Sequence, residues 1–394
     1  MEETPLGKDR RLYVIFGITL IAVMGVASIT PALPKITATL GLTKAQAALL
    51  ISAFTFPGIF LTPLAGIAAD RWGRKTVLVP ALFLFALAGS SIFFVHDFRH
   101  IVLLRVIQGV GAAPLGSLNT TLVGDFFRGK QRPAAMGYNA SVLSLSTATY
   151  PLLGGLLAGI GWFYPFLMPL LAIPVALFVL FGMKEPDILK PSSMRQYLKD
   201  ISKSILRKEV IGIFLLGTIT FIILYGAFLT YMPFLLNQKF GLSSQQIGMV
   251  ISLSSLTSAI FATQVGRLTW KFGSVKLLKT AFALYALVSL SLPFLNNLYV
   301  LLLPVLVFGA AQALNLPSLQ TTLANLAPDN QRGAFMSLNG MVIRLGQTLG
   351  PLFIGIGYAR GDLRGAYFLA GLIALLGLLV LFLFLKEERL KAAE

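Results

Sequence analysis

Apolar residues fill twelve stretches of the chain, each long enough to cross a lipid bilayer as one α-helix. A helix rises 1.5 Å per residue, so about 20 apolar residues span roughly 30 Å of hydrocarbon. The predicted spans are 12–33, 46–68, 76–95, 99–122, 134–159, 161–183, 210–236, 245–267, 275–294, 298–325, 334–357 and 362–385. The pattern therefore predicts an all-α integral membrane protein.

The second half of the chain repeats the first at an offset of 200 residues. The recurring positions include Gly66 and Gly73 as Gly266 and Gly273, Gln131-Arg132 as Gln331-Arg332, and Pro151-Leu152 as Pro351-Leu352. Because an even number of helices separates the copies, both should cross the membrane in the same direction. We therefore predict two parallel six-helix halves, residues 1–183 and 210–394, joined by a linker at 184–209.

Composition narrows the chemistry that this chain can carry. Hydrophobic residues make up 56% of it and charged residues 12%, whereas about a quarter of residues are charged in soluble proteins. The net charge of +17 comes from basic residues spaced between apolar runs, which argues against nucleic-acid binding. The chain has no cysteine and two histidines, His96 and His100. We therefore expect no disulfide, no metal site and no cofactor.

The lysines and arginines also predict an orientation. Most of them fall at one end of the predicted helices, the end that carries both termini and the linker. Basic residues are retained on the cytoplasmic side of a membrane. We therefore expect a multi-pass protein of the cell membrane, embedded in the lipid bilayer as a monomer, with both termini cytoplasmic.

The loop after the second span carries the most specific pattern in the chain. Its spacing is G-x-x-x-D-R-x-G-R-K, formed by Gly66, Asp70, Arg71, Gly73, Arg74 and Lys75. This pattern resembles the signature loop of the major facilitator superfamily, in which the Asp and the second Arg belong to a cytoplasmic latch that holds the halves together in the outward-facing state. The resemblance assigns the latch to Asp70, Arg71, Gly73, Arg74 and, at the end of the fourth span, Asp125. The second-half loop has Trp270 in place of Asp70, so the latch should be asymmetric.

Two more stretches resemble motifs of the same superfamily. Arg105-Val-Ile-Gln108-Gly109 is similar to its fourth-helix motif, for which a part in proton transfer or charge balance is proposed, and structural packing is the alternative. The fifth span is similar to a Gly- and Pro-rich motif of drug:proton exporters, although Tyr150 stands where that motif has Gly. The residues expected to kink and pack helices are Pro151, Gly154, Gly155, Gly350 and Pro351, with plain packing as the alternative.

None of the fifteen acidic residues lies in the middle of a predicted span. Many cation-exporting relatives carry a carboxylate in the first helix, whereas residues 12–34 offer none. A lipophilic cation bound by charge is therefore disfavoured. Proton coupling or charge balance is assigned instead to Arg105 and to two carboxylates at the helix ends, Asp70 and Asp125.

Arg344 lies about halfway along the eleventh span. Two interior arginines without an interior acid favour anionic, zwitterionic or neutral amphiphilic cargo, and the alternative is that Arg344 bonds to helix carbonyls. The other predicted cavity residues are polar or adaptable apolar side chains of the spans: Gln108, Asn119, Tyr138, Asn139, Tyr225, Tyr231, Gln312, Asn315, Asn339, Gln347, Met24, Phe54, Phe56 and Phe228. For each of these, helix-to-helix packing is the alternative role.

These features together look most like the twelve-helix drug:proton antiporter branch of the superfamily. The predicted protein is no enzyme but a secondary active transporter, a proton-coupled exporter of drugs or other amphiphilic small molecules that works by rocker-switch alternating access. The alternative is an organic-anion exchanger or uptake carrier of the same fold, with Arg105 and Arg344 as substrate counter-charges. A non-transporting membrane sensor is a weaker interpretation. Such a protein needs a docking segment, and here that segment would have to be the short linker.

Overall fold

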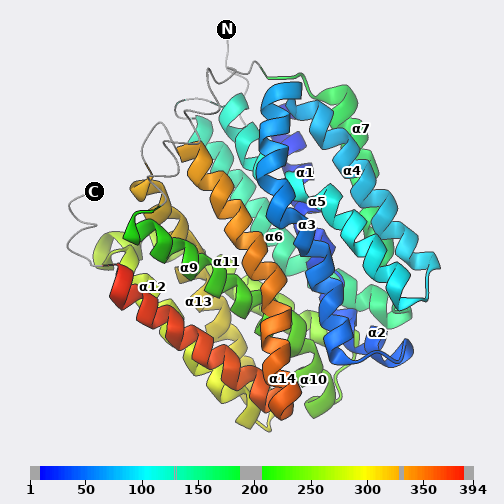
Figure 1. The fold of residues 1–394 in the computed structure, drawn as a ribbon, viewed down its shortest axis with the longest axis vertical. Coiled ribbons are helices and arrows are strands. Elements are labelled where there is room, and N and C mark those ends of the chain that lie inside the picture. The colour runs from blue at the N-terminus through cyan, green and yellow to red at the C-terminus, as the bar shows by residue number, and fades with distance from the viewer. Residues whose placement is uncertain (1–8, 128, 130, 187–205, 328–331, 386–394) are drawn as a thin grey trace.

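The computed structural model describes residues 9–127, 129, 131–186, 206–327 and 332–385, and most of the predicted linker lies outside these ranges. The described chain forms two helical bundles (Figure 1). The first contains α1 (Arg10–Ala27), η2 (Thr30–Ala32), α2 (Leu33–Thr39), α3 (Lys44–Trp72), α4 (Arg74–Ser91), η3 (Ile92–Phe94), α5 (Phe98–Phe126), α6 (Gln131–Ile160), η4 (Tyr164–Leu171) and α7 (Ala172–Gly182). The second contains α9 (Lys208–Ile222), η5 (Ile223–Tyr231), α10 (Met232–Phe240), α11 (Ser244–Phe272), α12 (Ser274–Ser291), η6 (Leu292–Phe294), α13 (Leu298–Leu326) and α14 (Arg332–Phe384).

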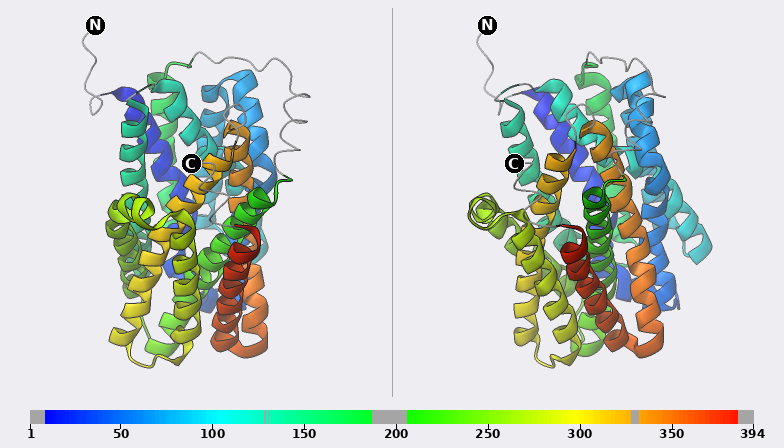
Figure 2. Two further views of the ribbon diagram at one scale, coloured as in Figure 1. Left: turned by 90° about the vertical axis from the view of Figure 1, so that its left-hand side faces the viewer. Right: turned by 60° about the vertical axis from the view of Figure 1, so that its left-hand side comes forward.

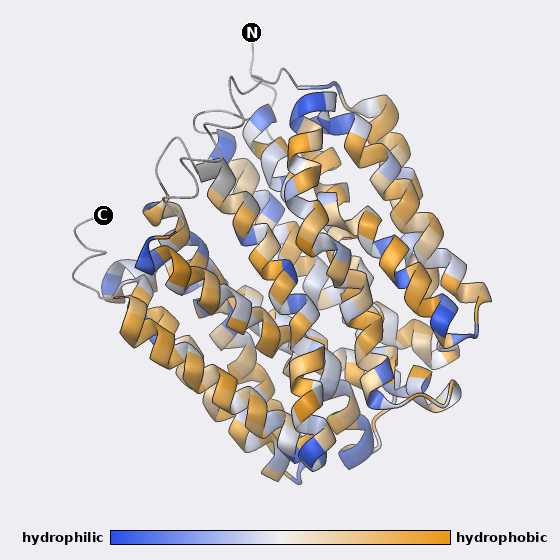
Figure 3. Ribbon diagram, viewed as in Figure 1, coloured by the Kyte–Doolittle hydropathy of each residue, from blue (hydrophilic) through white to orange (hydrophobic). Residues whose placement is uncertain are grey.

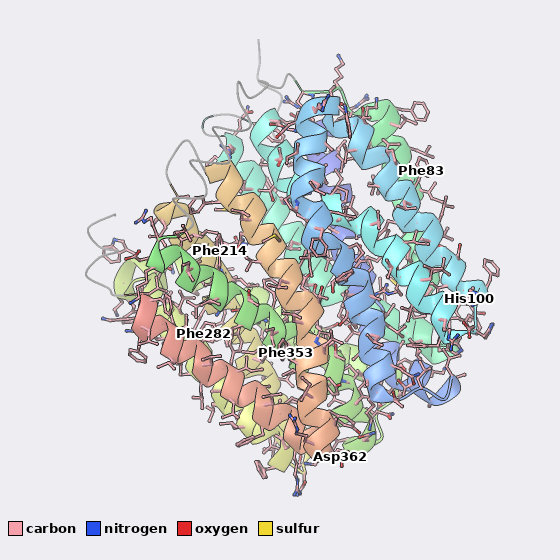
Figure 4. The ribbon with its side chains drawn as sticks, viewed as in Figure 1. Phe83, His100, Phe214, Phe282, Phe353 and Asp362 are labelled. Atoms are coloured by element: carbon pink, nitrogen blue, oxygen red, sulfur yellow. The ribbon has the colours of Figure 1, made fainter. Side chains whose placement is uncertain are left out.

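Eleven continuous helical segments of the described chain are long and apolar enough to cross a membrane. The last of them, Leu338–Phe384, is a pair of helices, because Gly361 and Asp362 leave the helical conformation and Asp362 takes a φ of 51°. The chain turns back at this point, beside the label of Asp362 in Figure 4, and Gly357 packs against the carbonyl of Gly365. The described chain therefore makes the twelve predicted crossings, and apolar residues dominate the sides of both bundles (Figure 3).

The two halves repeat one another helix by helix. Helices α3 and α11 occupy 44–72 and 244–272, and the same offset relates α5 to α13. Both α3 and α11 begin with a reciprocal cap, in which Thr43 or Ser243 bonds to the glutamine three residues later. The predicted arrangement of two parallel six-helix halves is confirmed.

The halves meet along two seams, α3 against α14 and α6 against α11. We call the end at which α3 passes into α4, and α11 into α12, the basic end, and the other end the opposite end. Near the basic end, Phe261 to Gln264 of α11 are all exposed, and four consecutive residues cover a full helical turn. Tyr138 and Leu145 of α6 are 52% and 66% exposed. The α6–α11 seam is therefore open here, where the last turns of α11 project outward (Figure 2).

The seventh span differs from the single helix predicted at 210–236. Between α9 and α10, the segment η5 takes the wider turn of a π-helix over Ile223–Tyr231. The Thr230 hydroxyl donates to the carbonyl of Tyr225, five residues earlier, at 2.6 Å. Gly226 in this segment packs against the carbonyl of Gly350 in α14. π-helical turns are rare and are found frequently at functional sites.

Candidate functional site

Arg74 is buried at the basic end of the first half, between two carboxylates. Its Nε donates to Oδ2 of Asp125 at 2.9 Å, and its Nη1 donates to Oδ1 of Asp70. The Arg74 side chain is 4% exposed, whereas Asp70 is 43% and Asp125 24% exposed. We call these three residues the Arg74 cluster; it ties together the ends of α3, α4 and α5. The structure thus brings these predicted latch residues together, while their role in a latch stays a prediction.

A carboxylate that the sequence did not single out completes this corner. Gly73 joins α3 to α4 at a φ of 102°, a conformation that favours glycine, and it offers no side chain to cap α4. Glu185, just after α7, supplies the cap: its Oε1 accepts from the amide of Arg74 and its Oε2 from the amide of Lys75 at 3.1 Å. A helix N-terminus favours such an anion. The only signal in the sequence is an acid directly after the sixth span.

Removing this cap should destabilise the basic end of the first half. Glu185→Ala leaves two amides of α4 without their acceptor, and loss of an N-terminal cap typically costs about 1 kcal/mol. The expected result is a melting temperature a few degrees lower for the detergent-purified protein, with Glu185→Gln intermediate. Lys184→Ala, at the neighbouring exposed position, is the control and should melt like the wild type. Wild-type melting of Glu185→Ala would contradict the capping role.

The remaining basic residues of the two signature loops lie outside such clusters. Arg71 is exposed and is not part of the Arg74 cluster. In the second half, Trp270 is 91% exposed. Neither Arg267 nor Lys271 pairs with a carboxylate within the described parts of the chain. At the basic end the two halves therefore differ in charge pairing.

Arg105 is fully enclosed in the first half, 1% exposed. Its Nε donates to the carbonyl of Leu50 at 3.0 Å, its Nη1 donates to Oε1 of Gln108 at 2.8 Å, and its Cζ lies 4.4 Å from the ring centre of Phe54. Asp125 is twenty residues further along α5, or about 30 Å of helix. Arg105 and the carboxylates of the Arg74 cluster are therefore separate sites.

Three of the predicted first-half residues bond to one another or pack in the core. Asn119 donates to the carbonyl of Ile15 at 2.8 Å and to the hydroxyl of Thr19 at 2.7 Å, and it accepts from Asn139 at 2.7 Å. The Thr19 hydroxyl in turn donates to Asn139. These bonds join α1, α5 and α6. Met24 of α1 is wholly buried, whereas Phe56 is 50% exposed.

Arg344 lies in the α3–α14 seam and reaches the other half of the protein. Its Nη2 is 3.4 Å from the carbonyl of Ala112 in α5, and its Nη1 donates to Oε1 of Gln347 at 3.1 Å. Its aliphatic stem packs over Gly58 of α3. In the same seam, the hydroxyl of Ser52 donates to the carbonyl of Thr348 at 2.8 Å. Among the described residues no carboxylate compensates Arg344.

The predicted residues of the second half are spread over several places. Asn315 accepts from the Thr220 hydroxyl at 3.0 Å, with Gln312 one turn away and Phe228 stacked on Phe308. Tyr225 lies in η5, where its carbonyl accepts from Thr230, and Asn339 is half-buried in α14. Tyr231 stacks on Tyr358 near the opposite end, with ring centres 5.5 Å apart.

Backbone contacts at small residues close the opposite end. Gly155 packs on the carbonyl of Ser244, and Gly248 on that of Pro151, so α6 and α11 touch across the halves. The neighbouring Gly154 instead packs on Ser28 within the first half. In the second half, Gly350, next to Pro351 inside α14, packs on Ile222 and Gly226.

A cation from the first half also docks on the second at this end. The Nζ of Lys44 donates to the hydroxyl of Tyr358 and lies 4.5 Å from the centre of its ring. The ring of Phe234 lies 5.9 Å from the same ammonium group. A cation near aromatic faces is attracted to them. The closed end is therefore held by backbone packing and by this contact.

Comparison with known proteins identifies the family of this chain. A family model described as Major Facilitator Superfamily matches residues 15–243 and 214–394. The chain belongs to the major facilitator superfamily.

The relatives of this superfamily member include named resistance proteins. It is 26% identical to Multidrug resistance protein 2 of Bacillus subtilis (strain 168) over 370 residues, 91% of each chain. It is 24% identical to the Quinolone resistance protein NorA of Staphylococcus aureus over 352 residues, 88% of this chain and 89% of the relative. The solved structure of the nucleoside transporter NupG has the same fold, with a TM-score of 0.76 at 14% identity and coverage of 96% of this chain and 98% of that one.

Proposed function

We propose that this superfamily member exports drugs or other amphiphilic small molecules from the cell, driven by inward movement of protons. The observation that carries the proposal is the arrangement of the halves, closed at the opposite end by Gly155 and Gly248 and parted along α6 and α11 at the basic end. The excess of Lys and Arg makes the basic end cytoplasmic. In the proposed export cycle, cargo enters at this open end from inside the cell, and rocking of the halves releases it outside.

The relatives support drugs or similar amphiphiles as cargo. Two of them are named for resistance to many drugs or to quinolones. The interior of this chain fits such molecules, because buried apolar and aromatic residues surround isolated polar groups and two arginines. Organic anions remain the second candidate, carried by the same arginines.

The Arg74 cluster supplies the proton-sensitive element in this proposal. Asp125 and Asp70 hold the buried Arg74 within the first half, and a proton on either carboxylate removes one of its charged partners. Closing the basic end brings this corner toward the second half, where the latch would form. The same residues of the Arg74 cluster would therefore take up the proton and control the conformational change.

Transport into proteoliposomes tests the proposal. Purified protein should move a fluorescent amphiphile against its gradient when a pH gradient is imposed, and a protonophore should stop it. Asp125→Asn should flatten the pH dependence. The protein is an anion exchanger instead if it concentrates cargo independently of the pH gradient and only when a second organic anion is present on the other side of the membrane.

Arg344 should distinguish cargo by charge. A partly desolvated guanidinium offers a fork suited to a carboxylate, and such a charge-assisted bond is worth roughly 1.5–3 kcal/mol. Arg344→Gln is therefore expected to weaken binding of an anionic amphiphile by about 10- to 150-fold and to spare its neutral methyl ester. Arg344→Lys, which keeps the charge without the fork, should fall between. Equal losses for acid and ester would show that Arg344 only holds the α3–α14 seam.

A further inference from the structure

Two buried amides in α13 have polar atoms without a hydrogen-bond partner in the described part of the chain. Gln312 is 7% exposed and Asn315 is fully buried. Within the described residues, neither polar atom of the Gln312 amide has a partner, nor does Nδ2 of Asn315. Buried polar groups are nearly always paired, because an unpaired one loses its hydration without compensation. These three atoms therefore call for a partner.

The first half shows that this bundle can satisfy such groups. There, Thr19, Asn119 and Asn139 bond to one another across three helices, and Asn119 also reaches a backbone carbonyl. Around Gln312 and Asn315, by contrast, the amides have a single side-chain hydrogen bond among the described residues, from the Thr220 hydroxyl to Asn315. Other buried polar atoms of the described chain also lack a partner, among them Nη2 of Arg105 and Nε2 of Gln108, but among the described residues only Gln312 leaves two side-chain atoms unpaired.

The surroundings of the two amides define a seam. Gln312 and Asn315 are three residues apart, so they share a side of α13. Asn315 accepts from Thr220, which turns this side toward α9. One turn before Gln312, Phe308 stacks on Phe228 of η5, with ring centres 4.1 Å apart and planes 6° from parallel. The amides thus lie beside a flat aromatic pair between α9, η5 and α13.

We propose that this seam, formed by Thr220, Gln312, Asn315 and the Phe228–Phe308 pair, binds a neutral donor–acceptor group of the cargo, such as a carboxamide on an aromatic ring. Gln312 offers a donor and an acceptor and Asn315 a second donor, which match the C=O and N–H of an amide. The described contacts of these residues include no charged side chain, which favours a neutral group over an ionised one. The inference rests on the proposed function and names the part of the cargo that the second half recognises.

A matched pair of probes tests the subsite. Tritiated N-butyl-2-naphthamide is measured by scintillation proximity on the purified full-length protein, against its ketone isostere, in which a methylene replaces the N–H. The wild type should bind the amide about tenfold more tightly than the ketone. In Gln312→Met the two should bind within twofold of each other. Asn315→Ser is the second variant, should Gln312→Met fail to fold, and should also lower the preference.

Ser318→Ala is the control for the loss of a buried polar group near Asn315, because Ser318 has no partner for its hydroxyl among the described residues, lies three residues after Asn315 and is about 120° around α13 from Gln312. It should keep the tenfold preference. Equal binding of both probes by the wild type, or an unchanged preference in Gln312→Met, overturns the subsite. The subsite is also overturned if Gln312→Met is more stable than the wild type and binds both probes with unchanged affinity, since the amides would then bind only water. A wild type that binds neither probe and exports no amphiphile overturns the proposed function itself.

Discussion

Gly155→Ala is expected to slow transport by roughly 5- to 150-fold while leaving the protein folded. A Cβ at this position would lie 2.4 Å from the carbonyl oxygen of Ser244 in the other half, so α6 and α11 would have to separate by about 1 Å. Overpacking of this kind costs about 1–3 kcal/mol, and here the cost falls only on the state in which the opposite end is closed. The equilibrium should therefore shift roughly 5- to 150-fold toward opening of that end.

Because the chain has no cysteine, one engineered thiol can report this shift. Ser52 is buried in the α3–α14 seam, and in a Ser52→Cys background an impermeant maleimide added outside the cell should react faster after Gly155→Ala. Gly154→Ala is the matched control. Its Cβ would meet Ser28 inside the first half, so it should lower stability without raising labelling. Normal transport and slow labelling in Gly155→Ala would disprove the role of this contact.

Arg74→Gln should lower the maximal transport rate at least tenfold and change cargo affinity no more than a few-fold. The substitution removes the cation that holds Asp70 and Asp125 together, far from the interior arginines. Both carboxylates are partly exposed and stay hydrated, so the variant should still fold. Asp70→Asn is expected to follow the same pattern.

Arg267→Gln is the control for this prediction, since Arg267 is an exposed arginine of the second-half loop and pairs with no carboxylate within the described residues. It should change the transport rate less than twofold. Transport in proteoliposomes and equilibrium binding are measured on the same preparations. A large loss of affinity with normal turnover in Arg74→Gln would place the cluster in cargo recognition instead of in the conformational cycle.

Much of the fold could be predicted from the sequence, because a bilayer leaves a spanning chain few choices. Apolar runs of sufficient length must be helices, and the 200-residue repeat fixes the relation of the halves. The π-helical segment η5 could not be predicted, since its residues are as apolar as those of any span and its geometry depends on the approach of Gly226 to α14. The reversal at Gly361 and Asp362 matches the boundary predicted between the last two spans.

The candidate site could be predicted only where the spacing of charged residues in the sequence indicates that they interact. The D-R-x-G-R pattern placed Asp70 and Arg74 on either side of the turn at Gly73, and the structure joins them across it. The capping role of Glu185 could not be predicted, because its partners are backbone amides at the start of α4, far away in the sequence. Every residue except proline has such an amide, so the residue types do not reveal the contact. For the same reason, the sequence could not tell that Asn119 has partners for its amide whereas Gln312 has none among the residues that the structure describes.

At the opposite end, the halves meet through backbone contacts at Gly155 and Gly248. The two ends of the molecule should therefore tolerate substitutions to different degrees. Every amino acid other than glycine adds at least one atom to these contacts, so single-nucleotide changes there should be purged from a population. The uncovered turns of α11 at the basic end have no such restriction. Lineages of this superfamily member could therefore diversify at the basic end while inheriting an unchanged seal at the opposite end.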